Sequence, residues 1–473
     1  MQTNSPENIH SVSMVSSGVF EETDKKNIPA PEDYDQLVSD HALLESTKTL
    51  GLRVRLPSPS KPIIYVVRPD VIDDVLRDNV SFGLGNYDEA FSDLNFVLSD
   101  DETQYALKRK LIGKIFKHRD HSASIADLQI SDLAYEISSQ ISQILMLNTK
   151  QKGEFDIIRD YGSMVIYLVS CRAFGLRGNR KSIAVVRLLR TLRAAFSFRR
   201  FNLTPVSREM QNMLTTCQLF FAQLFLNFRN KNTGLAWVGK SVARQLQKDC
   251  SDALSKREQL PPSCFAAQLI DAKRSIDNES GNTHTIGETQ KAIEELLLEF
   301  VTTLIMIVNV GFVGVLKSIE SSNISLTEAS KRAAEPDTGS KFVNEALRIN
   351  SPTATVYRRA KEDCVLGNAH ISKGEDLILL IKQASLYEGR FPEPTKLNTD
   401  QQDSKYLHFG PYEGVHACLG QNWAKEIIRQ MLIALSGFDS VRFKEDPKLF
   451  FGTPESWTVG FKPQSGSRGP YDR

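Results

Sequence analysis

Cysteine is scarce in this sequence, and no two cysteines lie close together. The chain of 473 residues contains six: Cys171, Cys217, Cys250, Cys264, Cys364 and Cys418. Small secreted proteins that depend on disulfides show dense and regular cysteine spacing instead. We therefore expect reduced thiols, no disulfide framework and an intracellular location, cytoplasmic or peripheral to a membrane.

A surplus of charge of one sign is missing as well. Lysine and arginine together number 58 against 57 aspartate and glutamate residues, which gives a net charge of +1. Proteins whose main partner is nucleic acid carry a basic surplus, so we expect no nucleic-acid partner. Hydrophobic residues make up 41% of the chain, which is sufficient for a substantial core.

The N-terminal region lacks an apolar segment. Residues 1–30 are polar and offer no apolar core for a secretory signal or a transmembrane anchor. We expect a polar, disordered tail there and one catalytic domain over residues 31–473. The most apolar run, 301–316, contains two threonines and an asparagine and is too short for a comfortable membrane span. We interpret it as a buried core helix.

Two patterns describe the rest of the chain in outline. Near the N-terminus, apolar spacing predicts a helix over 34–51, and β-branched runs predict strands at 53–56 and 63–67. Further along, arginines alternate with leucine and phenylalanine over 185–200. Such a basic amphipathic helix could touch a membrane surface, although arginines facing solvent and leucines facing the core are the favoured explanation.

One cysteine lies in a loop rich in glycine and proline that leads into a helix. Residues 408–420 read His-Phe-Gly-Pro-Tyr-Glu-Gly-Val-His-Ala-Cys-Leu-Gly, and an apolar helical pattern follows directly. Cys418 is therefore placed beside the unpaired N–H groups and the positive end of a helix dipole, a setting that favours thiolate. A thiolate there serves as a nucleophile or a metal ligand, and the plain alternative is a buried cysteine without chemistry.

The pattern Gly414-x-His416-x-Cys418-x-Gly420 resembles the heme-binding loop of the cytochrome P450 family. The resemblance implies that Cys418 is the axial ligand of heme iron and that His416 donates to a heme propionate. Gly414 and Gly420 would let the backbone come close to the flat cofactor.

The aromatic residue of this loop is displaced relative to the family. In the family it lies seven residues before the cysteine, where this chain has Pro411. The nearest aromatic of the right character is Phe409, two residues earlier, so we assign it the role of shielding the sulfur of Cys418. The loop carries either a two-residue insertion or an altered shield.

Two arginines resemble the family's propionate ligands. The basic helix at 105–116 resembles the family helix that carries His or Trp and, four residues on, an Arg that contacts a propionate. Arg109 takes the place of that Arg, and Tyr105 stands where the His or Trp would be; a solvated basic face is the plain alternative. In the family, the strand after the Glu-x-x-Arg helix carries an Arg that binds a propionate. Arg358 has the register of that Arg, with Arg359 as the near alternative.

A helical pair resembles the family's Glu-x-x-Arg element. Glu345 and Arg348 stand at i and i+3 and therefore on one helix face within pairing distance. Residues 389–400 resemble the family's meander before the cysteine loop, and in the family an Arg just after the meander completes this structural element. Here Gln401 and Gln402 occupy that place, so we expect an incomplete triad.

Together these elements imply a cytochrome P450 fold, mainly α with small β-sheets. The resemblance implies one large domain that holds heme b between a long distal helix, 294–316 in this chain, and the proximal cysteine loop. Family monooxygenases usually carry an acid and a Thr at the centre of that helix, where this chain has Asn309. If the register differs, Thr302 and Thr303, with Glu299 nearby, take the place of Asn309. The plain alternative is that Asn309 is an amide hydrogen-bonded inside a helix bundle, with no catalytic part.

The resemblance leaves the reaction open between two chemistries. One is O2-dependent monooxygenation of an apolar lipid or secondary metabolite, with electrons from an NADPH-dependent reductase and proton delivery by Thr302 or Thr303. The other is rearrangement of a hydroperoxide without reductase, as in allene oxide synthases and the P450 domain of fungal fatty-acid diol synthases, with Asn309 steering the peroxide. A heme-binding scaffold without turnover is the third possibility.

Overall fold

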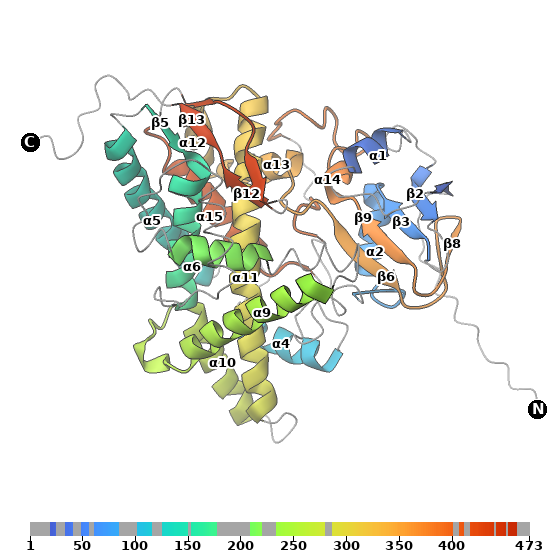
Figure 1. The fold of residues 1–473 in the computed structure, drawn as a ribbon, viewed down its shortest axis with the longest axis horizontal. Helices are drawn as coiled ribbons and strands as arrows, with labels where there is room; N and C mark the ends of the chain where they lie inside the picture. Colours follow the sequence, from blue (N-terminus) through green and yellow to red (C-terminus); the bar gives the residue numbers. More distant parts are fainter. Residues whose placement is uncertain are drawn as a thin grey trace, which may run out of the picture. The chain divides into compact units, whose positions relative to one another are not determined.

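The structure is a computed structural model that describes residues 19–24, 34–40, 49–55, 61–84, 102–115, 125–149, 153–176, 209–219, 233–279, 286–400, 406–410, 417–438, 441–450 and 453–460. These residues form mainly helices with small sheets (Figure 1), which confirms the predicted fold class. They divide into two compact units. Unit 1 takes its residues from 1–86, 353–395 and 403–418, and unit 2 from 87–352, 396–402 and 419–473.

Unit 1 is built on a six-stranded sheet with the order β1-β2-β3-β9-β6-β4. Its strands are β1 (Val19–Asp24), β2 (Thr49–Arg55), β3 (Ile63–Val66), β4 (Phe82–Gly83), β6 (Val356–Ala360) and β9 (Asp376–Leu379). β1 pairs with β2 in parallel and β3 with β9 in parallel, and the other neighbours are antiparallel. Strand β1 lies inside the stretch predicted to be a tail, whose other residues fall outside the described ones.

The sheet explains where the N-terminal predictions succeed and fail. All four residues of β3 are buried, as expected of an apolar β-branched run in a central strand. The helix predicted over 34–51 is wrong in length, because α1 (Tyr34–Asp40) is short and Thr49 already belongs to β2. Pairing with strands on both sides outweighs the local helical spacing of 49–51.

Short elements complete unit 1. They are α2 (Pro69–Arg77), α14 (Ile381–Ala384) and the two-stranded hairpin of β7 (Cys364–Leu366) and β8 (Ala369–Ile371). Helix α2 begins at a proline, which suits the first helical position. Its apolar residues at helical spacing are buried, so it packs into the unit's core.

Unit 2 is mainly helical. Its helices are α4 (Glu102–Ile115), α5 (Ile125–Thr149), α6 (Ser163–Phe174), α9 (Thr233–Leu254), α10 (Phe265–Glu279), α11 (Ile286–Ser321), α12 (Leu326–Ala334), α13 (Gly339–Ile349) and α15 (Gln421–Ile433), with a π-helical turn η2 (Ile157–Gly162) and a short 3-10 turn η3 (Arg257–Gln259). Its strands are β5 (Glu154–Asp156), β10 (Arg442–Phe443), β11 (Lys448–Phe450), β12 (Thr453–Ser456) and β13 (Thr458–Gly460).

Helix α11 is the long apolar centre of unit 2 and packs against α4, α6, α9, α10, α13 and α15. Residues 287–321 are long and apolar enough to cross a membrane, but 78% of the most apolar window is buried inside the protein. The expectation of a buried core helix over the apolar run is confirmed.

Glycine lets α11 approach α13 closely. A Cβ at Gly314 would lie 2.4 Å from the carbonyl oxygen of Asn350, at the end of α13. Beside this contact, the Ser318 hydroxyl donates to the carbonyl of Ala346 at 2.7 Å and accepts from the Asn350 amide at 2.9 Å. Neutral close packing therefore fixes α11 against α13.

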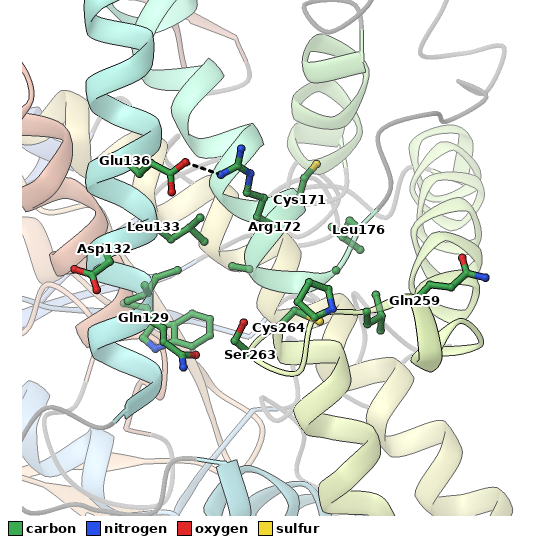
Figure 2. A pocket seen from close by; sticks show the side chains of 16 residues that line it. Gln129, Asp132, Leu133, Glu136, Cys171, Arg172, Leu176, Gln259, Ser263 and Cys264 are labelled. Atoms are coloured by element: carbon green, nitrogen blue, oxygen red, sulfur yellow. Dashed lines mark hydrogen bonds and ion pairs between the residues drawn. The ribbon is translucent and has the colours of Figure 1, made fainter.

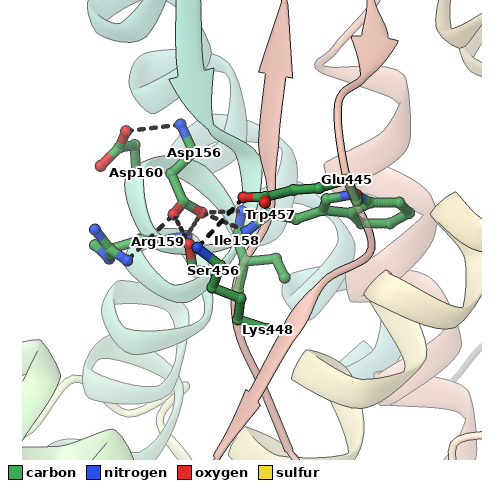
Figure 3. A network of polar contacts seen from close by, with 8 residues as sticks. All are labelled: Asp156, Ile158, Arg159, Asp160, Glu445, Lys448, Ser456 and Trp457. Carbon is green, nitrogen blue, oxygen red and sulfur yellow. Dashed lines mark hydrogen bonds and ion pairs between the residues drawn. The ribbon is translucent and has the colours of Figure 1, made fainter. Parts of the chain in front are cut away.

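A buried carboxylate ties the C-terminal strands to the start of α6 (Figure 3). Asp156 accepts from the backbone N–H groups of Ile158 and Arg159 and so caps η2. It also accepts from the Ser456 hydroxyl and the Trp457 backbone N–H. Strands β12 and β13 are thereby fixed to the element that leads into α6.

Candidate functional site

The predicted iron ligand lies just ahead of α15 in the chain. Cys418 is partly exposed, as are the residues beside it. Gly420 caps α15, and a Cβ added to it would meet no atom of the described residues within 4 Å. This open space beside the helix cap fits a flat group lying against the backbone. Gly414, His416 and Pro411 lie outside the described residues, so their predicted roles stay predictions.

The other cysteines are less suited to bind a metal. All six are free of disulfides, and Cys217, Cys250 and Cys264 are buried. Half-buried Cys364 is surrounded by carboxylates, and burial together with those charges raises its pKa to about 11. It therefore stays a neutral thiol at ordinary pH, whereas a metal ligand must be thiolate.

An aromatic series leads up to the cysteine loop in unit 1. Phe391 stacks on Tyr406 at 5.9 Å between ring centroids, Tyr406 is 5.5 Å from His408, and His408 meets Phe409 edge to face at 4.8 Å. Phe409 is half-buried at the end of this series. The series fixes the position from which Phe409 would shield a sulfur.

Arg109 is held by the residue that replaces the family's His or Trp. Its Nε donates to the Tyr105 hydroxyl at 2.6 Å, and its guanidinium carbon lies 5.2 Å from the centroid of the same ring. Both side chains are partly exposed on α4. The Nε–hydroxyl bond orients the guanidinium on α4.

The two neighbouring arginines of β6 have different surroundings. Arg359 makes a two-pronged pair with Asp376 on β9, at 2.7 and 3.2 Å. Arg358 is 2% exposed and donates to the backbone carbonyl of Tyr357 at 2.8 Å. Because Arg359 is committed to a carboxylate across the sheet, Arg358 is the better candidate for a propionate.

The Glu-x-x-Arg pair has the geometry that its spacing predicts. Glu345 and Arg348 on α13 are completely buried and joined by two hydrogen bonds, of 2.9 and 2.7 Å. The backbone N–H of Asn398, in the segment resembling the meander, donates to Glu345 at 3.4 Å. Gln401 and Gln402 lie outside the described residues.

The centre of α11 has one open face. Thr303, Ile307 and Val310 are partly exposed, whereas the other residues of 301–316 are buried. Their spacing of i, i+4 and i+7 places them in one row along the helix. The Thr303 hydroxyl donates to the carbonyl of Glu299 at 2.5 Å. The open face thus carries one hydroxyl among apolar side chains.

The other two residues predicted from this helix lie on its buried side. The Thr302 hydroxyl is fully buried and donates to the carbonyl of Leu298 at 2.8 Å. Asn309 is 2% exposed, and its Nδ2 donates to the carbonyl of Pro454 on β12 at 3.0 Å. Its Oδ1 makes no hydrogen bond in the described part of the chain. The sequence predicts that Ile305, Ile307, Val308, Val310 and Phe312 contribute to the pocket that this helix faces; of these five, Ile307 and Val310 are partly exposed and the other three are buried.

The buried phenol of Tyr161 packs against this helix. Burial raises the pKa of Tyr161 well above its usual range, and its hydroxyl donates to the carbonyl of Met431 at 2.6 Å. Its ring lies 5.9 Å from that of Phe312 on α11. Tyr161 therefore stays neutral and fixes α11 relative to α15 instead of taking part in proton transfer.

A surface groove of about 560 Å³ lies elsewhere in unit 2 (Figure 2). It is lined by α5, α6, the segment before α10 and Trp423, and the ion pair of Glu136 and Arg172, 3.2 Å apart, spans its rim. It contains none of the site residues predicted from sequence.

Each unit, taken by itself, offers residues whose chemistry suits heme. In unit 1, partly exposed Cys418 is a soft ligand for iron and Arg358 is a cation that suits a propionate. In unit 2, Arg109 is a second such cation. The open face of α11 offers apolar surface for a hydrophobic cofactor or substrate.

Residues 340–454 match the family model described as Cytochrome P450. Among curated relatives, the chain is 29% identical over 109 residues to cytochrome P450 CYP199A2 of Rhodopseudomonas palustris and 28% identical over 130 residues to a steroid C26-monooxygenase of Mycolicibacterium smegmatis. These matches cover 23% and 26% of this chain, and 26% and 32% of the relatives' own lengths. A fungal relative, psi-producing oxygenase A of Aspergillus fumigatus, is 29% identical over 131 residues, which is 26% of this chain and 12% of that protein.

Solved structures extend the likeness to nearly the whole chain. The structure of CalO2 superimposes with a TM-score of 0.68 at 16% identity and covers 92% of this chain and 98% of its own. The Bacillus subtilis cytochrome P450 PksS superimposes with a TM-score of 0.64 at 17% identity, over 92% and 99%. The chain therefore has the cytochrome P450 fold and, through residues 340–454, a sequence match to the cytochrome P450 family.

Proposed function

We propose that this chain is a heme-thiolate oxidoreductase that binds heme b through Cys418. The proposal rests on the open space beside Gly420, on partly exposed Cys418 and on the family match that includes both. When bound, a thiolate-ligated heme supplies an electron-rich iron that favours O–O bond cleavage. Arg109 and Arg358, with His416 and Gly414 as predicted from sequence, would hold the cofactor.

O2-dependent monooxygenation is the reaction that α11 supports best. The observation that carries it is Thr303, the one hydroxyl in the row of three partly exposed residues, Thr303, Ile307 and Val310. Its hydroxyl, anchored to the carbonyl of Glu299, has a free lone pair to accept from a water and so to hold a proton source. The Asn309 side-chain amide, by contrast, already donates to the carbonyl of Pro454.

The substrate and the partner follow from this chemistry. Ile307 and Val310 give the open face an apolar character, which favours a small apolar lipid or secondary metabolite. One relative is named a steroid C26-monooxygenase. Electrons for O2 reduction would come from an NADPH-dependent reductase.

Hydroperoxide rearrangement is the second candidate, and one observation favours it. The open row of Thr303, Ile307 and Val310 contains no carboxylate, and family monooxygenases usually pair an acid with the Thr. Rearrangement of a substrate that already contains an O–O bond needs no such pair and no reductase.

An optical experiment separates these functions. The purified protein is reduced under CO, and the ferric form is mixed with a fatty-acid hydroperoxide in the absence of reductant. A reduced CO band at the thiolate position, without peroxide consumption, supports monooxygenation, and rapid reductant-free turnover supports rearrangement. Heme retention with neither activity indicates a binding protein, and an unchanged spectrum in Cys418→Ala contradicts the proposal itself.

Threonine variants sharpen the choice, because two neighbouring threonines lie on different faces. We expect Thr303→Ala to lower the yield of oxygenated product per reductant consumed on the order of 10²-fold, the low end of a lost proton-transfer group. Thr302→Ala is the matched control, since its hydroxyl is bonded inside the helix. Equal losses in both variants would contradict the assignment of Thr303.

A further inference from the structure

We infer that the buried ion pair of Lys108 and Glu295 is a positioning device that sets the rotation of α4 on α11 and thereby presents Arg109 to a carboxylate of the cofactor. The inference rests on the proposed function, because Arg109 has such a ligand only if heme binds. Lys108 and Glu295 do not touch the cofactor in this proposal and act through their neighbour.

The pair is isolated from solvent. The Lys108 Nζ lies 2.7 Å from a Glu295 oxygen, and the two side chains are 0% and 2% exposed. The other Glu295 oxygen lies 3.7 Å from the ammonium of Lys291, which is 59% exposed. Of these two cations, Lys108 is buried and comes from another helix, whereas Lys291 is largely exposed and lies one turn away on α11.

Stability alone does not account for such a pair. Removing two charges from water costs as much as their mutual attraction returns, and apolar residues of similar volume usually serve a core equally well or better. Buried ionic groups are instead best attested as devices that fix one register among several. In this chain, Lys108 and Glu295 can select one rotation of α4 on α11.

The apolar contacts of α4 do not fix that rotation by themselves. Its buried residues Leu107, Leu111 and Ile112 keep one face of the helix turned to the core, but apolar contacts are non-directional and leave smaller rotations open. Such a rotation would carry the Lys108 Nζ away from the Glu295 oxygen that it meets at 2.7 Å and leave the buried ammonium without this carboxylate. The ion pair therefore makes one rotation strongly preferred.

Arg109 follows Lys108 directly, so its direction is set by the same rotation. The Tyr105 hydroxyl, one turn earlier, fixes the guanidinium relative to the helix, and the ion pair fixes the helix relative to α11. The two contacts together leave the guanidinium a single direction before any ligand arrives. Preorganisation of this kind lowers the cost of binding an anion.

The test replaces the pair by apolar residues of similar volume, in Lys108→Met/Glu295→Leu, and avoids the single variants that would leave an unpaired buried charge. The rate of heme loss to an excess of a heme-free acceptor protein is measured together with the thermal midpoint of the heme-free chain. We expect an unchanged or higher midpoint and a roughly tenfold faster loss of heme, comparable to that of Arg109→Ala.

A triple variant shows whether the pair acts through Arg109. If it does, adding Arg109→Ala to the double variant produces no further acceleration, because residues that act as one unit are not additive. The matched control is Lys273→Met/Asp277→Leu, which removes a mostly buried pair within the single helix α10 and should leave heme loss unchanged.

Three results would overturn the inference: heme loss at the wild-type rate in the double variant, additive effects in the triple variant, or equal acceleration in the control pair. Failure of the proposed function gives a different pattern. In that case the unmodified chain retains no heme, or Cys418→Ala retains it with the original spectrum.

Discussion

Among the described residues of unit 2, two buried ion pairs differ in what brings the partners together. Glu345 and Arg348 lie one turn apart on α13, so the helix itself sets their separation. Lys108 and Glu295 lie on different helices, so their contact exists only after α4 has packed on α11. The first pair is a property of a segment, whereas the second depends on the relative position of two segments.

The largest effect is expected from breaking the local pair. Glu345→Ala leaves the Arg348 guanidinium buried without its carboxylate, which should lower the free energy of unfolding by about 3–5 kcal/mol. Urea denaturation of the heme-free chain measures the loss. The double variant Glu345→Leu/Arg348→Met removes both charges and should recover most of it; no recovery would mean that Arg348 has further partners that matter more.

A smaller effect is expected from the uncharged contact between Gly314 on α11 and the end of α13. Gly314→Ala would place a methyl group against the backbone oxygen of Asn350, which cannot move aside as a side chain could. We expect a loss of about 1–3 kcal/mol in unfolding free energy. Gly113→Ala, on the exposed side of α4 with no atom within 4 Å, is the matched control and should stabilise slightly through helix propensity. Equal stability of both variants would show that α11 can shift relative to α13.

The smallest effect is expected from an exposed counterpart of the local pair. Glu328 and Arg332 stand one turn apart on α12, 2.8 Å from each other and nearly half exposed. Because solvent screens this pair, Glu328→Gln should cost about 0.3–0.5 kcal/mol and nothing measurable in 1 M salt. A loss that persists in high salt would indicate a role beyond the ion pair.

The same distinction explains how much could be predicted from the sequence. Features decided within one segment were predicted correctly: the Glu345–Arg348 pair, the helix that carries Arg109, and the buried central strand 63–66. In each case the period of the helix or strand determines which side chains meet. The match to a known family then supplied the fold, which local patterns alone do not determine.

Features that depend on distant segments were not predictable. Spacing shows that Thr302 and Asn309 share a face of α11, but not that Pro454 on a C-terminal strand takes the Asn309 amide. Lys108 belonged to an unremarkable basic helix in the sequence, and no local pattern connects it with Glu295. The direction of each face depends on which element packs against it, and that information lies elsewhere in the chain.

The apolarity of α11 has a consequence for synthesis of the protein. The helix ends at Ser321, whereas α15, which packs against it, ends at Ile433, roughly a hundred residues later. At roughly 5–20 residues per second, the nascent chain carries this segment without α15 for roughly 5–20 seconds. During that interval, membrane-insertion machinery and other growing chains would recognise the apolar residues of α11. The cell's chaperones therefore have this helix to protect.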